Sequence, residues 1–135
     1  MLRVVLTCFA ASIHIASEHH VFNSIECDCR EQMEASQAII EQAGRGVIVW
    51  LDQEGKGNGH LALLQSIPFK KEFGQAAAYE KAGFKADARD YRAAVEILND
   101  LKVKSIMLLA NDTGKAEELR RNGLTVSGLQ KLVSD

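Results

Sequence analysis

The sequence predicts an α/β fold, a three-layer α/β/α sandwich with a mixed or mostly parallel sheet. Two short apolar runs, Val47–Leu51 and Ser105–Leu109, are typical of strands covered on both faces. In the second half of the chain, stretches with helical periodicity alternate with such runs. This alternation indicates βαβ units, in which helices cover both faces of a sheet.

The first strand is expected within Arg3–Ala16, because Val4–Ala10 is rich in residues that favour strands. The same region superficially resembles a short signal peptide. Polar residues interrupt its apolar run, however, and nothing approaches the ~20 residues of a membrane-spanning helix. We therefore expect a buried strand here, and no membrane partner.

The first helix is expected from about Asp28 to Ala43, with Gly44 as its stop. After the strand at Val47–Leu51 comes the loop Asp52–His60, whose three glycines at alternating positions let the backbone approach a ligand closely. A short helix then ends or restarts at Pro68.

The remaining elements are three helices and two strands. Gly74–Ala82 favours a helix, and a strongly periodic helix follows with its apolar face running from Tyr91 to Leu101. After the strand Ser105–Leu109, a helix runs to Arg121 and a last strand lies near Leu124–Val126. Loops that follow strands lie where α/β sheets bind ligands, so Asp52–His60 and Asn111–Lys115 are candidate ligand loops.

The composition describes an ordinary globular chain. Its 135 residues are about one domain, 1–135, which is large enough for a hydrophobic core. The net charge is −2 and the 16 basic residues are scattered, so neither a nucleic-acid partner nor a membrane surface is indicated. Three cysteines argue against a secreted disulfide framework and for a reducing compartment, and we expect a cytoplasmic protein.

Two of the cysteines, Cys27 and Cys29, lie one residue apart at the start of the first helix. Thiolate is a good zinc ligand, and a catalytic zinc site has three protein ligands. His14, His19 and His20 lie just upstream. From the pair alone, zinc binding and burial as small apolar side chains are equal alternatives.

Four motifs occur together in the order and approximate spacing of the GTP cyclohydrolase II family. They are the SEHHVFNSIECDC stretch, the VWLDQEGKGNG loop, GFKADARDY and LLANDTGK, and the resemblance covers about Ile13 to Val126. It implies an enzyme that opens the purine ring of GTP with a catalytic zinc ion, releases formate and pyrophosphate, and serves riboflavin biosynthesis. It also implies a homodimer with a nucleotide substrate.

The resemblance assigns catalytic roles to two residues. Asp87 looks like the acidic active-site residue of the family, and Arg89 resembles the arginine that attacks the α-phosphate and displaces pyrophosphate. A neighbouring carboxylate can orient a guanidinium, which binds phosphate in a fork. Without the resemblance, the favoured interpretation is that Asp87 and Asp90 are helix N-caps and Arg89 a surface cation.

Substrate contacts are implied in two loops. Glu54 and Gly55 fall in the nucleotide-contacting QEG loop of the family, and Lys115 matches its phosphate-side lysine. Lys56 adds positive charge beside them.

The chain departs from the family pattern at two places that bear on function. The first of three zinc cysteines is missing, and we expect His19 to replace it beside Cys27 and Cys29, with His20 as the alternative. Ala77 stands where the family has the glutamate that recognises guanine, so the base is left open. The alternative to a cyclohydrolase is therefore a non-catalytic nucleotide- or zinc-binding relative.

Overall fold

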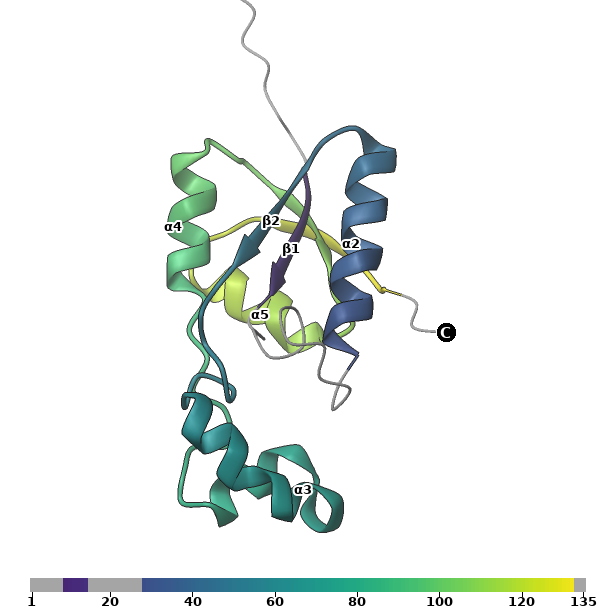
Figure 1. The fold of residues 1–135 in the computed structure, drawn as a ribbon. Helices are drawn as coiled ribbons and strands as arrows, with labels where there is room; N and C mark the ends of the chain where they lie inside the picture. Colours follow the sequence, from purple (N-terminus) through teal and green to yellow (C-terminus); the bar gives the residue numbers. More distant parts are fainter. Residues whose placement is uncertain (1–8, 15–27, 133–135) are drawn as a thin grey trace, which may run out of the picture.

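The computed structural model describes residues 9–14 and 28–132 (Figure 1). In chain order its elements are β1 (Phe9–His14), α2 (Cys29–Ala43), β2 (Gly46–Trp50), α3 (His60–Lys81), α4 (Arg92–Asp100), β3 (Ile106–Leu109), α5 (Thr113–Arg121) and β4 (Val126–Gln130).

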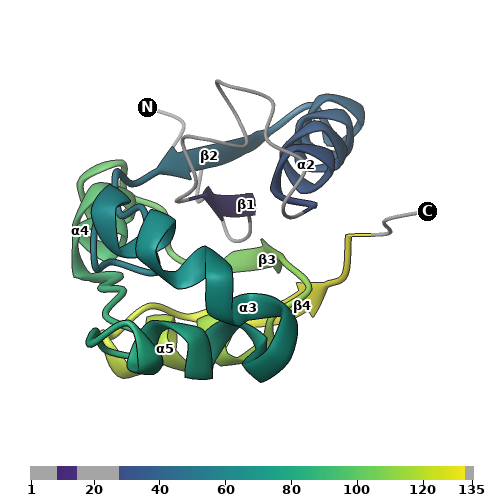
Figure 2. The same ribbon diagram turned by 60° about the horizontal axis from the view of Figure 1, so that its bottom comes forward.

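Within these residues the strands form one parallel sheet in the order β2-β1-β3-β4. Helix α2 lies on one face of the sheet, and α4 and α5 lie on the other (Figure 2). The predicted α/β fold is confirmed, and the sheet is parallel throughout the described residues. After β1, the chain adds β2 along one edge of that strand and then adds β3 along its opposite edge. The strand order therefore reverses between β1 and β3.

The main core lies between the sheet and the two helices on its second face. Fully buried side chains of the central strands include Ile13, Ile106 and Leu108, and they belong to one cluster with Leu98 of α4 and Leu119 of α5. These residues recur at strand and helix spacing in the sequence, which is why both helices pack onto the sheet with their apolar faces. The core thus fixes the strand ends and the loops that follow them.

Most predicted elements lie where the pattern placed them. Helix α2 ends at Gly44, which has the left-handed conformation (φ 70°) expected of a glycine cap. The expectation that Val47–Leu51 is covered on both faces is wrong, because β2 is an edge strand and Trp50 is 46% exposed. The apolar face of α4 likewise stops short of Leu101, which is 53% exposed.

Helix α3 differs most from the expectation. The helix continues through Pro68 and is kinked at Gly74 (φ 77°, ψ 171°). The break at Gly74 folds the chain back, so that Leu63 before it and Tyr79 after it share one small buried cluster. Figure 1 shows α3 beyond the carboxyl edge of the sheet, away from the main core.

The last strand, β4, begins at Val126 and so lies later than the expected Leu124–Val126. Among the described residues, no helix combines the length and the apolar character needed to cross a bilayer.

Candidate active site

The carboxyl edge of the sheet gathers most of the described candidate residues. The loops after β2 and β3 and the first turns of α2 and α5 all lie at this edge, because the strands are parallel. In open α/β sheets, ligands bind at this edge where the strand order reverses. Here that place is between β1 and β3.

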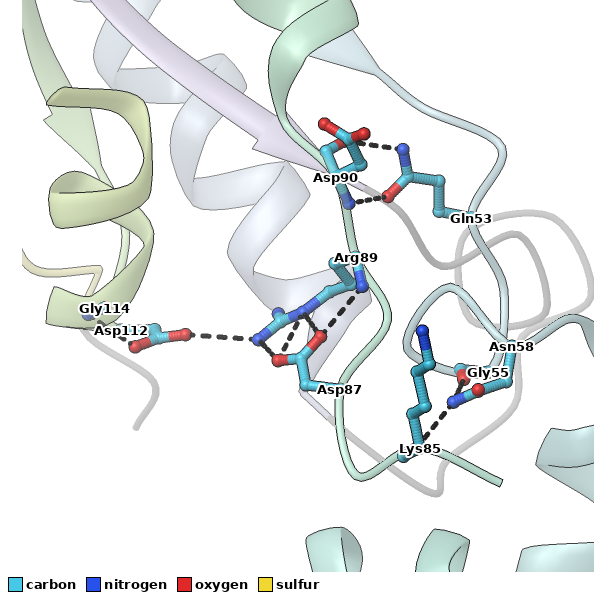
Figure 3. Close-up of polar contacts among 9 residues, drawn as sticks. All are labelled: Gln53, Gly55, Asn58, Lys85, Asp87, Arg89, Asp90, Asp112 and Gly114. Carbon is cyan, nitrogen blue, oxygen red and sulfur yellow. Dashed lines mark hydrogen bonds and ion pairs between the residues drawn. The ribbon is translucent and has the colours of Figure 1, made fainter. Parts of the chain in front are cut away.

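Arg89 and Asp87 form a two-pronged ion pair just before α4 (Figure 3). The guanidinium donates from Nε to both Asp87 oxygens at 2.9 and 3.0 Å, and from Nη2 to Oδ2 at 2.5 Å. The backbone N–H of Arg89 also donates to Asp87 Oδ1 at 3.0 Å. The carboxylate therefore fixes both the backbone and the side chain of Arg89.

The electrostatics of this pair favour two charged groups. Partial burial pushes the pKa of Asp87 upward, but the hydrogen bonds from Arg89 outweigh burial and hold that pKa below its usual value. Burial is the largest single influence on Arg89 and works against its charge, but the bond to Asp87 and the charges of Asp87 and Asp112 together raise the pKa of the guanidinium. Asp87 is therefore an ionised anchor at neutral pH.

The far side of Arg89 faces the loop after β3. Its Nη2 lies 3.6 Å from Oδ2 of Asp112, whose Oδ1 accepts a hydrogen bond from the N–H of Gly114 and so caps α5. Among the described residues, Nη1 of Arg89 has no hydrogen-bond partner. Asp87 thus holds Nε and Nη2, Asp112 lies beside Nη2, and Nη1 is the nitrogen that a ligand anion could contact.

Tyr91 lies beneath this cluster. Its ring centroid is 5.9 Å from Cζ of Arg89, within the range of a cation–π contact. The residue is 4% exposed, and among the described residues its hydroxyl finds no hydrogen-bond partner. Burial raises the pKa of Tyr91 to about 12, so the phenol is neutral.

Lys115 approaches the same edge from the first turns of α5. Its Nζ donates a 2.9 Å hydrogen bond to the carbonyl of Ile13, near the end of β1. Burial and the neighbouring charge of Arg89 lower the pKa of Lys115 to about 8. The sheet thus brings two cations, predicted from distant motifs, within electrostatic reach of each other.

The glycine loop packs against the segment that carries Asp87 and Arg89. A Cβ at Gly57, which has φ +82°, would lie 2.4 Å from the carbonyl oxygen of Ala88. This glycine therefore allows close approach to the protein's own chain, whereas the sequence suggested close approach to a ligand. Gly55 is buried in the same loop, and the charge of nearby Lys56 contributes to the lowered pKa of Asp87.

The predicted zinc ligands are described only in part. Cys29 is the first residue of α2, a position where the helix dipole favours a thiolate. The donor chemistry of Cys29 therefore fits a zinc ion. Cys27 and His19 lie outside the described residues, as does the alternative ligand His20. Within residues 9–14 and 28–132, no cluster of three metal-binding side chains occurs.

Cys29 is disulfide-bonded in the structure. A disulfide sulfur is not a thiolate, so zinc binding at this position requires the reduced protein.

Two residues of the site were missed by sequence reasoning. Asp112 gives Arg89 a second carboxylate, and its position between a strand and a helix N-terminus was a usable signal. Gln53 was read only as part of the glycine loop, yet its side chain binds the backbone of Asp90. Nothing local in the sequence connects residues 37 positions apart.

Comparison of the sequence with known proteins identifies a family and several relatives of this chain. A family model described as GTP cyclohydrolase II matches residues 14–131. The riboflavin biosynthesis protein RibBA of Bacillus cereus (strain B4264) is 42% identical over 107 residues, which are 78% of this chain and 27% of that protein. The RibBA protein of Chlorobium phaeovibrioides is 40% identical over 106 residues, 78% of this chain and 26% of that protein. The chain therefore spans about a quarter of the length of these curated relatives.

Proposed function

Because this chain belongs to the GTP cyclohydrolase II family, we propose that it is a zinc-dependent hydrolase that opens the ring of a purine nucleotide, GTP or a related one. Formate and pyrophosphate are the other products. The observation that carries the proposal is the Arg89 guanidinium, which Asp87 holds along one edge while Nη1 stays without a partner among the described residues.

In this proposal Arg89 acts on the phosphate end of the nucleotide. A guanidinium can bind phosphate through its N–H donors, and Nη1, which neither Asp87 nor Asp112 contacts, is the donor proposed to do so. Asp87 holds the guanidinium in place and stays ionised because its pKa is lowered. These two residues form the catalytic pair.

Lys115 and Lys56 supply further positive charge for the phosphates. Lys115 lies within electrostatic reach of Arg89, and Lys56 within reach of Asp87. Glu54 and Gly55 contact the nucleotide from the glycine loop, which packs against the Arg89 segment at Ala88.

The zinc ion is held by Cys27, Cys29 and His19 in this proposal. When bound, zinc is a Lewis acid that makes water a stronger nucleophile near neutral pH, which suits attack on an electron-poor ring carbon. The position of Cys29 at a helix N-terminus supports this role. Because these ligands must be reduced, the proposed site requires a reducing compartment, which is consistent with the proposal of a cytoplasmic protein.

We further propose that the protein is a homodimer. Helix α3 leaves Leu61, Leu64 and Ile67 exposed at 63%, 48% and 41%, which is apolar surface that association can cover. Sedimentation should give a dimer, and a monomer at all concentrations would contradict this assignment.

The test of the function uses reduced, zinc-loaded protein and a panel of purine nucleoside triphosphates. We expect formate and pyrophosphate from at least one of them, together with a change in absorbance as the ring opens. Stoichiometric nucleotide binding without product would instead support the non-catalytic relative, which the alanine at position 77 favours.

A further inference from the structure

The glycine loop and the Arg89 segment are joined at three points along their length, and Figure 3 shows the two that Gln53 and Asn58 make. The side chain of Gln53 binds the backbone of Asp90, the carbonyl of Lys56 accepts from the N–H of Ala88 at 2.8 Å, and Nδ2 of Asn58 donates to the carbonyl of Lys85 at 2.9 Å. The two segments therefore run antiparallel, and two of the contacts flank Arg89, at Ala88 on one side and at Asp90 on the other.

Gln53 satisfies both backbone groups of one residue. Its Nε2 donates to the carbonyl of Asp90 at 2.6 Å, and its Oε1 accepts from the N–H of Asp90 at 2.9 Å. A primary amide has a donor and an acceptor in one plane, so it can pair with a peptide group much as a neighbouring strand does. Both bonds are partly buried, which limits competition from water.

The Arg89 segment depends on hydrogen bonds from the glycine loop, because it belongs to no helix or strand whose backbone bonds would hold it. Residues 86–91 lie outside helices and strands, and α4 begins only at Arg92. The direction of the guanidinium follows from the backbone at residues 87–90, since Asp87 binds both the N–H and the side chain of Arg89. A shift of this backbone moves the whole ion pair.

We propose that Gln53 is a positioning residue, which fixes the catalytic Asp87–Arg89 pair by holding both backbone groups of Asp90. The next two residues after Gln53 are Glu54 and Gly55, so the same contact ties the nucleotide-binding loop to the phosphate-binding arginine. The link to catalysis rests on the proposed function, whereas the effect of Gln53 on the geometry of Arg89 does not.

The geometric effect is tested first, by NMR on the protein without nucleotide. In Gln53→Ala, the amide of Asp90 should lose its hydrogen-exchange protection, by about tenfold or more. The Nε–H resonance of Arg89 should shift or broaden, while the amides of β1 and β3 stay protected. Asp52→Asn changes the exposed neighbour of Gln53 and should leave both signals as in the parent.

A second variant covers the case in which Gln53→Ala does not fold. Gln53→Glu keeps the length of the side chain and the acceptor for the Asp90 N–H, but sets a carboxylate oxygen against the Asp90 carbonyl. We expect an intermediate shift of the Arg89 Nε–H resonance. Parent-like Asp90 and Arg89 signals in a folded Gln53 variant would overturn the proposal.

The kinetic arm then asks whether position matters for turnover. Misplacement by about 1 Å can cost ~100-fold in rate, so we expect Gln53→Ala to lower kcat by about 10- to 100-fold and to change KM much less. In an Arg89→Ala background, Gln53→Ala should cause no further loss. Additive losses would overturn the link to Arg89. Absence of turnover in the parent would contradict only the proposed function, because the NMR arm still decides on Gln53.

Discussion

Two neighbouring Asp-x-Arg triplets, residues 87–89 and 90–92, have nearly the same local geometry. In each, the arginine N–H donates to Oδ1 of the preceding aspartate, at 3.0 Å in the first and 2.9 Å in the second. In each, Nη2 of the arginine lies 2.5 Å from Oδ2. The sequence spacing therefore dictates the same pair twice.

Their surroundings separate the two pairs. The side chain of Arg89 is 18% exposed and lies near Asp112 and the ring of Tyr91, whereas that of Arg92 is 75% exposed and begins α4. Exposed ion pairs contribute little to stability because water screens them. Position at the carboxyl edge of the sheet, rather than the motif, is what makes Arg89 a candidate for chemistry.

The largest expected difference is between the two arginines. Arg89→Ala should lower product formation by at least about 100-fold, since it removes charged donors aimed at the phosphates. Arg92→Ala should stay within about twofold of the parent, as expected for a surface pair. Steady-state rates of formate release measure both, and equal losses in the two variants would erase the distinction.

A smaller difference is expected between the two aspartates. Asp87→Asn removes the charge that anchors Arg89, and we expect a loss of about tenfold or more in kcat with zinc content unchanged. The matched change Asp90→Asn should have little effect, because Gln53 binds the backbone of Asp90 rather than its side chain. Zinc content by elemental analysis separates loss of metal from loss of positioning.

The pH dependence of nucleotide binding sharpens the role of Lys115, which shares the buried environment of Arg89. Its pKa of about 8 means that it is protonated below that pH and neutral above it, so affinity for a nucleotide should fall as pH rises through 8. About a tenth of Lys115 is charged at pH 9, which corresponds to weakening by up to about tenfold. Titration calorimetry at pH 7 and 9 measures this change.

Lys115→Met is the control for that titration. Binding by this variant should be weaker at pH 7 and should no longer respond to pH around 8. In the ligand-free protein, the lowered pKa of Lys115 affects folding stability, which changes with pH in the opposite direction to nucleotide affinity. The unfolded state binds more protons than the folded state between pH 8 and 10.5, so the contribution of Lys115 to stability rises over this window. An unchanged binding profile in Lys115→Met would assign the pH response to another group.

The smallest expected effect is at Tyr91, whose ring lies against Arg89. Its hydroxyl has no partner among the described residues, so Tyr91→Phe removes an unsatisfied polar atom and should stabilise the fold by up to about 1 kcal/mol. The ring that faces Arg89 is retained. Denaturant unfolding measures the change, and destabilisation by more than about 1 kcal/mol would mean that the hydroxyl makes a bond in solution.

Sequence patterns were sufficient for the fold because most of its elements are defined locally. The helical periodicity of α2 and α4 and the apolar run that forms β3 can each be recognised from the local sequence, and each defines which side chains face the core. The pattern misplaced features that depend on tertiary context. Trp50 is exposed because β2 lies at an edge, and the break in α3 falls at Gly74 rather than at Pro68 and lets Leu63 and Tyr79 share one cluster.

The candidate site was predicted only in part, for a related reason. Asp87, Arg89 and Lys115 were identified from motifs, and the structure brings them to one edge of the sheet. The motif alone does not separate Arg89 from Arg92, since burial distinguishes them and burial is a property of the whole fold. The link from Gln53 to Asp90 spans 37 positions and has no local signal.

One measurement tests the central claim most directly, which is that the Asp87–Arg89 pair at the sheet edge performs chemistry on a nucleotide. Reduced, zinc-loaded parent, Arg89→Ala and Arg92→Ala are incubated with GTP, and the products are identified by mass spectrometry. We expect a ring-opened product with formate and pyrophosphate from the parent and from Arg92→Ala, and at least about 100-fold less of it from Arg89→Ala. A ring-opened product with pyrophosphate from Arg89→Ala at the parent's rate would contradict the claim.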